Sequence, residues 1–149
     1  MSSVAEALAR FVIALDDHDW DGVTAALGET VGRDYTSLFG GEPDVVAGPA
    51  LASEWRGVLA GLDGHQHLLG MPRVDIEDDE ARVAVHVIGT HVLEGDPGSP
   101  WVVGGTYRFA LRRLDGRWRI VAITLDTRWQ TGDAAILQRA AVRRERARA

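Results

Sequence analysis

The stretch that decides the fold is WVVGGTYRFALRRLDGRWRIVAITLDTRW, residues 101–129. Two runs rich in β-branched and aromatic residues, 101–114 and 117–129, flank Asp115-Gly116, which is a strong signal for a two-residue hairpin turn. Both faces of the second run are apolar, with Val121, Ile123 and Leu125 on one face and Trp118, Ile120 and Ala122 on the other. We therefore expect one face to cover the core and the other to contact a second subunit.

Two further strands are predicted before this hairpin, over 67–76 and 81–94. Turn residues at 78–79 separate them, and a segment rich in glycine and proline leads from the second strand to the hairpin. Strands that follow one another through short turns pair mainly antiparallel. Alternation places His91 on the valine-rich face of its strand and His86 on the other face, and a bulge at Gly89 would exchange the two.

The N-terminal half is predicted to be mainly helical. Apolar residues recur at helical spacing over 4–16, and Asp19 suits the N-cap of a short helix over 20–27. A short strand over 31–35 and a loop over 36–48 are expected next.

A second amphipathic helix is predicted to start at Pro49 and to end near Gly61 or Gly64. Asp133 is expected to cap a C-terminal helix that runs to about Arg144. Helices followed by a meander of strands predict an α+β domain in which a curved sheet wraps around the helices and leaves a pocket on its concave face.

The composition limits the classes of function. The chain has 149 residues, which fits one domain, and its net charge of −6 argues against a nucleic-acid partner. We take residues 4–139 as the core and 140–149 as a basic tail. No apolar run approaches the ~20 residues of a membrane helix, and residues 1–6 lack the features of a signal peptide, so the cytoplasm is the expected location.

Asp16 and His67 are the pair most able to carry chemistry. Asp16 extends the apolar face of the first helix, where a carboxylate is costly unless it has a partner. A histidine that met it would be oriented and made more basic, which gives a general base. The alternatives stay open: Asp16 can end its helix in solvent beside Asp17 and Asp19, and His67 can be an ordinary core histidine.

Other candidates are weaker. His65 and His67 would point to one side of a strand, as metal ligands do, but no carboxylate follows at a spacing that completes a metal motif. We expect no metal and no cofactor, and we expect His65 to lie at the rim or surface. Tyr35 can polarise a carbonyl or hold a water, or it can simply pack. Gly104-Gly105 lies inside a strand and forms no phosphate loop, and there is no nucleophile elbow.

Several short stretches follow one another in the order and at the spacing that is typical of a known family. They are Leu15-Asp16-Asp17-His18-Asp19-Trp20, Asp34-Tyr35-Thr36-Ser37-Leu38, Gln66-His67-Leu68-Leu69-Gly70, Thr90-His91, Leu114-Asp115-Gly116-Arg117-Trp118-Arg119-Ile120 and Thr127-Arg128-Trp129. Over about residues 4–139, the chain resembles the nuclear-transport-factor-two-like cone fold and, within it, the scytalone-dehydratase and polyketide-cyclase (SnoaL-like) group.

The resemblance implies a cone-shaped, strongly curved, mainly antiparallel sheet around N-terminal helices. It also implies catalytic roles for Asp16, His67, His91 and Tyr35. A second pocket tyrosine of scytalone dehydratases is Leu15 here, and a serine and an asparagine align with Gly105 and Tyr107. Residues expected to bind substrate are Leu15, Trp55, Leu69, Tyr107 and Phe109.

The resemblance therefore implies a cofactor-independent dehydratase or isomerase that acts on a small cyclic hydroxy-ketone or polyketide-like compound. His67 would take a proton α to a carbonyl, Tyr35 would stabilise the enolate, and His91 would protonate the leaving hydroxyl. A polyketide-type cyclase with the same pair is one alternative, and a non-catalytic small-molecule binder is another. A homo-oligomer is expected, either a dimer or a trimer, because relatives of this fold form both.

Overall fold

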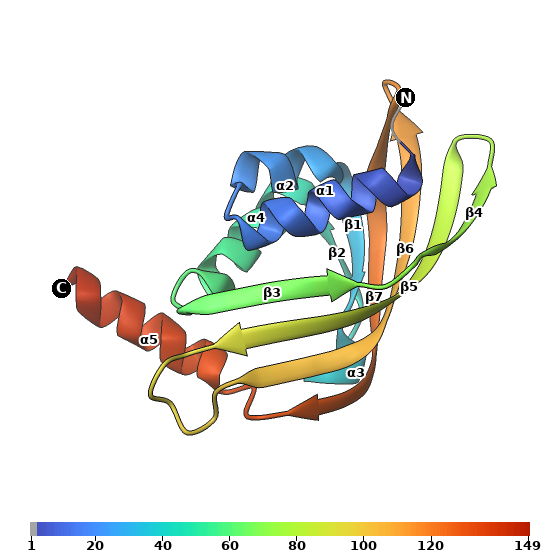
Figure 1. The fold of residues 1–149 in the computed structure, drawn as a ribbon. Helices are drawn as coiled ribbons and strands as arrows, with labels where there is room; N and C mark the ends of the chain where they lie inside the picture. Colours follow the sequence, from blue (N-terminus) through green and yellow to red (C-terminus); the bar gives the residue numbers. More distant parts are fainter. Residues whose placement is uncertain (1–2) are drawn as a thin grey trace.

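A strongly curved, seven-stranded sheet wraps around the N-terminal helices in the computed structural model, which describes residues 3–149 (Figure 1). The strands are β1 (Leu27–Asp34), β2 (Asp44–Ala47), β3 (Gly64–Leu69), β4 (Arg73–Glu77), β5 (Glu80–Val92), β6 (Trp101–Leu114) and β7 (Arg117–Thr131). Their order is β2-β1-β7-β6-β5-β3, with β4 also paired to β5, and only the β1–β7 pair is parallel. The predicted α+β class, with a mostly antiparallel sheet, is confirmed.

The β6–β7 hairpin forms at the predicted turn. Asp115 and Gly116 both have positive φ, at 52° and 76°, which is the requirement of a type I′ turn. Farther along, the register slips by one residue, so that Leu111 pairs with Ile120 whereas Ala110 pairs with Ala122.

This irregularity corrects the predicted faces of the last strand. Val121 is the extra residue, and each extra residue exchanges the two faces beyond it. Ile120, only 1% exposed, therefore shares the buried side with Ile123 and Leu125, whereas Val121 is half-buried. The predicted subunit contact on the outer face, where Trp129 is exposed, stays a prediction.

The strand predicted over 67–76 is two strands. Gly70, Met71 and Pro72 separate β3 from β4, and Met71 is 95% exposed. Proline has no N–H for a ladder, so the pairing with β5 stops here and resumes at Arg73.

The loop predicted over 36–48 holds two short elements, α3 (Thr36–Phe39) and β2. Asp34 starts α3, because its Oδ1 accepts hydrogen bonds from the backbone N–H and the hydroxyl of Thr36. The strand β2 pairs with β1 at the edge of the sheet. The prediction of an unstructured loop was therefore wrong for these residues.

The helices are α1 (Val4–Asp16), α2 (Trp20–Ala26), α4 (Gly48–Leu59) and α5 (Ile136–Arg148). Asp19 is the predicted N-cap of α2, and its Oδ1 accepts from the backbone N–H of Gly22. The helix α4 starts as predicted but ends at Leu59, before either glycine. Asp133 forms the turn that precedes α5 rather than its N-cap.

The helix α5 crosses the predicted boundary at residues 139–140. Ala140 is fully buried, and Ala141 lines a cavity of about 650 Å³, so the segment 140–149 is more than a solvated tail. Arg139 pairs with Asp96 and Asp133 and so fixes the helix to neighbouring loops.

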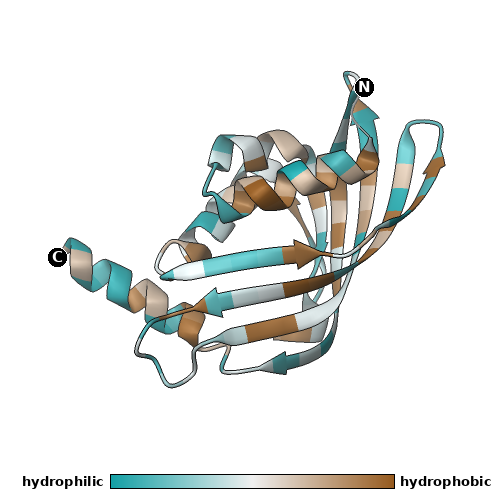
Figure 2. Cartoon of the chain, in the orientation of Figure 1, coloured by the Kyte–Doolittle hydropathy of each residue, from teal (hydrophilic) through white to brown (hydrophobic). Residues whose placement is uncertain are grey.

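Apolar side chains of α1 and of the inner sheet faces form the core. Brown, hydrophobic positions alternate with polar ones along the long strands in Figure 2. Among residues 3–149, no helix is both long enough and apolar enough to span a membrane. Met1 and Ser2, part of the stretch tested for a signal peptide, lie outside the described residues.

Candidate active site

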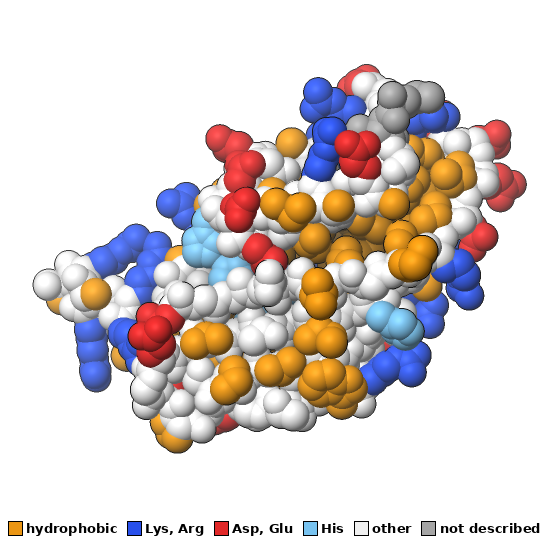
Figure 3. All heavy atoms as spheres, in the orientation of Figure 1, with side chains coloured by type: hydrophobic (Ala, Val, Ile, Leu, Met, Phe, Trp, Pro, Cys, Tyr) orange, Lys and Arg blue, Asp and Glu red, His pale blue; other side chains and the backbone are white. Residues whose placement is uncertain are grey.

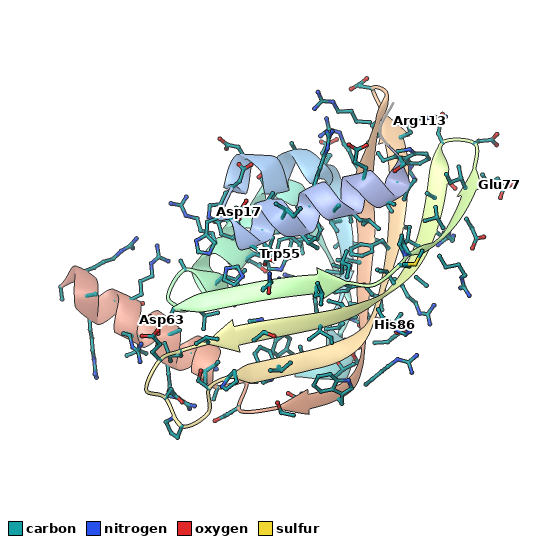
Figure 4. The ribbon with its side chains drawn as sticks, in the orientation of Figure 1. Asp17, Trp55, Asp63, Glu77, His86 and Arg113 are labelled. Atoms are coloured by element: carbon teal, nitrogen blue, oxygen red, sulfur yellow. The ribbon has the colours of Figure 1, made fainter. Side chains whose placement is uncertain are left out.

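A cavity of about 650 Å³ opens between the helices and the concave face of the sheet. Its wall is mainly apolar and carries six aromatic side chains, those of Phe11, Tyr35, Phe39, Trp55, Trp101 and Tyr107. Trp55 comes from α4, which with α1 and α2 packs on the concave side of the sheet (Figure 4). A cavity of this size and lining suits a small, largely apolar organic molecule.

Asp16 and His67 meet at one side of this cavity. Asp16 is the last residue of α1, and His67 lies on β3, whose side chains alternate between the two faces. The ring Nδ1 of His67 lies 2.8 Å from Asp16 Oδ1, and the backbone N–H of His67 donates to Oδ2, also at 2.8 Å. Because a carboxylate only accepts, Nδ1 carries the proton, and a neutral His67 presents an unprotonated Nε2 to the cavity that it lines.

Asp16 is held in its charged form. Burial raises the pKa of its carboxyl, but hydrogen bonds from the rings of His65 and His67 and from the backbone of His67 outweigh burial and hold the pKa well below its usual range. The anion therefore persists at any pH at which the protein is expected to work, and it can stabilise a protonated His67.

His65 lies elsewhere than predicted. Its side chain is 3% exposed rather than at the surface, and its Nδ1 lies 3.2 Å from Asp16 Oδ1. Its Nε2 lies 2.7 Å from Nε2 of the exposed His18, and the two rings stack with centroids 4.9 Å apart. In Figure 3, pale-blue histidine atoms gather where the end of α1 meets the start of β3.

Asp16, His65 and His67 also have the spacing of a metal-ligand set, since one ligand atom of each lies within 4.8 Å of the others. The same atoms are already joined by hydrogen bonds from both rings to the carboxylate, so the geometry is complete without an ion. The expectation of no metal stays a prediction.

His91 lines the cavity, and His86 does not. The β5–β6 pairing runs without interruption through Gly89, so the bulge that would exchange the two histidines is absent there. His91 packs edge-on against His67 at 5.9 Å between ring centroids. His86 is exposed on the other face of the sheet, with Nδ1 3.2 Å from the hydroxyl of Thr106 (Figure 4).

The environment of His91 does not suit the acid role predicted for it. Burial, and then the nearby His67, lower the pKa of His91 to about 4. Its Nδ1 lies 3.2 Å from the carbonyl of Trp101, to which it donates. A neutral His91 therefore offers only Nε2, as an acceptor, to a molecule in the cavity.

This protonation state predicts how stability depends on pH. Unfolded His91 protonates near pH 6.5 but folded His91 only near pH 4, so acid favours the unfolded chain in this window. Between pH 6.5 and pH 4, His91 should lower the free energy of unfolding of the wild type by on the order of 3 kcal/mol. His91→Leu should not show this acid-dependent decrease. Urea titrations at several pH values measure the free energy of unfolding of both proteins. If it changes with pH equally in the wild type and in His91→Leu, the prediction is wrong. His18, whose pKa burial also lowers, is present in both.

The remaining predicted residues divide into two groups. Tyr35, Tyr107, Leu15 and Trp55 line the cavity. Burial, and then the neighbouring Tyr107, raise the pKa of Tyr35 well above 10, and burial raises the pKa of Tyr107 to about 12. Both phenols are therefore neutral donors.

Phe109 and Leu69 do not line the cavity. Phe109 packs edge-on against Phe11 of the cavity wall, with ring centroids 6.3 Å apart, and is buried in the core behind it. Leu69 packs against the core. Both were predicted from their place on inward faces, but an inward face also supplies the solid core, so alternation alone could not separate the two environments.

Sequence reasoning missed two parts of the cavity wall. Arg33 lies in one of them and pairs with Asp44 at 2.7 Å and with Glu54. Leu137 and Ala141 of α5 close another side. The arginines of α5 suggested a solvated helix, whereas its apolar positions were the signal for packing.

The fold and this site define a SnoaL-like protein. The SnoaL-like domain family matches residues 1–124, and the chain belongs to that family. It has the nuclear-transport-factor-two-like fold, as its sequence predicted. A relative in Penicillium crustosum, "Terrestric acid biosynthesis cluster protein E", is 34% identical over 142 residues, which cover 90% of this chain and 86% of the relative.

Solved structures agree on the fold. The Kfla4162 protein of Kribbella flavida is 24% identical with a TM-score of 0.82, and the match covers 91% of this chain and 93% of that one. A putative scytalone dehydratase of Novosphingobium aromaticivorans is 19% identical with a TM-score of 0.75, over 87% and 85% of the two chains.

Proposed function

We propose that this protein is a cofactor-independent dehydratase or isomerase for a small cyclic hydroxy-ketone or polyketide-like compound. The observation that carries the proposal is the pairing of His67 with Asp16 at 2.8 Å at the wall of an apolar cavity. An imidazole whose Nδ1 is held by a carboxylate presents a basic Nε2 to whatever the cavity holds.

The chemistry follows from the groups around the cavity. His67 Nε2 takes a proton from the carbon α to the carbonyl, and the neutral phenols of Tyr35 and Tyr107 donate to the enolate oxygen that develops. In a dehydration, the imidazolium of His67 then returns the proton to the departing hydroxyl, and water leaves. In an isomerisation, the same proton returns to a different carbon. Neutral His91 orients the substrate by accepting from its hydroxyl.

The relatives support this class of chemistry. One relative is named for a biosynthesis cluster, and one structure of the same fold is described as a putative scytalone dehydratase. A non-catalytic binder has no need of the Asp16–His67 contact, so the 2.8 Å distance favours an enzyme. A polyketide-type cyclase would use the same pair, and only the product distinguishes it, because elimination releases water and cyclisation need not.

The test is proton exchange. Cyclic hydroxy-ketones incubated with the protein in D₂O should exchange the proton α to the carbonyl for deuterium, so its NMR signal should disappear. Compounds with a β-hydroxyl should also lose water, and mass spectrometry should detect the dehydrated product. Dialysis against EDTA should change neither result. Ligand binding with no exchange and no new product across the panel would make the protein a binder. Loss of activity on dialysis, restored by Zn²⁺, would overturn cofactor independence.

A further inference from the structure

Two histidines outside the proposed chemistry extend the Asp16–His67 pair to the protein surface. The exposed His18 contacts His65 at 2.7 Å between Nε2 atoms, and His65 Nδ1 lies 3.2 Å from Asp16 Oδ1, the oxygen that His67 also contacts. Four side chains thus form one continuous chain of hydrogen bonds, of which His67 reaches the cavity.

The charge of Asp16 fixes the two ring protons that face it. A carboxylate only accepts, so His65 donates from Nδ1, and when its ring is neutral its Nε2 is an acceptor. His18 must then donate from its own Nε2. The arrangement is internally consistent, since each contact has one donor and one acceptor when all three histidines are neutral.

We propose that His65 is a positioning residue of the catalytic pair, oriented in turn by His18. The proposal rests on the proposed function, in which Asp16 and His67 act as the base. His65 does two things for that base. It fixes the plane of the carboxylate, so that Oδ2 can accept from the backbone of His67, and it withdraws part of the charge that Asp16 would otherwise offer to His67.

Other charged and titratable groups around these two histidines are few. Asp17 and Asp19 flank His18 in the turn after α1, and both are exposed. His91 faces His65 across the β3–β5 ladder but is neutral. The ring of Trp20 lies 5.5 Å from that of His18 and limits its movement. Asp16 is therefore the charge that orients both rings.

The first experiment needs no substrate. Long-range ¹H–¹⁵N NMR of the free protein at neutral pH reports which ring nitrogen of each histidine carries the proton. We expect Nδ1–H for His65 and Nε2–H for His18, with the His65 pattern changed in His18→Asn. Asparagine tolerates the positive φ of 57° at this position but cannot reach His65. An Nε2–H tautomer for His65, or no response to His18→Asn, overturns the proposal.

The second experiment is kinetic. His65→Leu keeps the bulk but loses the donor, and kcat should fall about 10- to 100-fold with little change in KM, the order expected for one hydrogen bond to a charged group. His65→Asn should recover most of kcat, because its amide replaces Nδ1. The acid limb of kcat/KM should move to higher pH in His65→Leu, because the whole charge of Asp16 then stabilises protonated His67.

The controls separate two kinds of failure. His86→Leu changes a histidine on the other face of the sheet and should leave kinetics unchanged. If His67→Ala and Asp16→Asn are inactive but His65→Leu keeps the wild-type kcat, or loses activity with no shift of the acid limb, the positioning role alone is wrong. If His67→Ala or Asp16→Asn keeps full activity, the proposed function fails first.

Discussion

His67→Ala should lower turnover by about 10²–10⁴-fold, the usual contribution of a general acid–base group. The substitution removes the one imidazole in the cavity whose second nitrogen is held by a carboxylate. Binding should survive, because the apolar wall supplies most of the contact area. KM should therefore change little while kcat falls, and steady-state kinetics with the substrate identified by proton exchange measure both.

The fold should survive this change. The backbone N–H of His67 still donates to Asp16, and His65 still contacts the carboxylate, so the charge keeps two partners. Thermal unfolding of the variant checks this, and His86→Ala serves as the matched control on the other face of the sheet. Added imidazole should restore part of the activity by filling the space left behind. Full activity in folded His67→Ala would remove this residue from the mechanism.

The elements that the sequence predicted best are those encoded by neighbouring residues. The β6–β7 hairpin follows from Asp115-Gly116, because few residue pairs adopt positive φ twice in succession. The slip at Val121 had no such signal, since one extra residue in an apolar run leaves the composition unchanged and shifts only the pairing. The prediction that placed Ile120 and Ile123 on opposite faces of β7 was therefore wrong.

The site shows the same division. The sequence predicts a functional Asp16 because a carboxylate on an apolar helix face needs a partner, and the family resemblance implies that His67 is this partner. The contact between His65 and His18 depends on where the turn after α1 lies against the start of β3, some fifty residues along the chain, and no local pattern encodes that. Spacing did place His65 and His67 on one side of a strand, which was the available signal.

The wall formed by α5 was hidden for a different reason. Its arginines resemble a solvated helix end, yet Arg139 and Arg143 pair with acidic residues of the preceding loops, Asp96 and Asp63 among them. The arginines of these pairs are partly exposed, so each pair contributes little to stability, and the buried Ile136 and Ala140 are what pack α5 against the core. Charge counting alone therefore suggested a tail where the structure has a cavity wall.

Asp16→Asn should lower kcat by about 10⁴-fold, the order seen when the aspartate of a Ser-His-Asp triad becomes asparagine. Asp16 accepts hydrogen bonds at both oxygens, whereas an amide has one acceptor and one donor. If the amide oxygen faces the backbone N–H of His67, the NH₂ group faces Nδ1 of the same ring. Nδ1 must then accept, and the proton moves to Nε2, where the base needs its lone pair.

The opposite orientation of the asparagine is no better, because its NH₂ group would then face the backbone N–H of His67, donor against donor. The loss should thus arise from the wrong tautomer of an intact His67 rather than from unfolding. Ring ¹⁵N shifts should report Nε2–H for His67 in this variant and Nδ1–H in the wild type. Asp17→Asn, one residue away and exposed, is the control and should change neither kcat nor the tautomer. An inactive Asp16→Asn that keeps the wild-type tautomer would mean that the carboxylate acts by its charge alone.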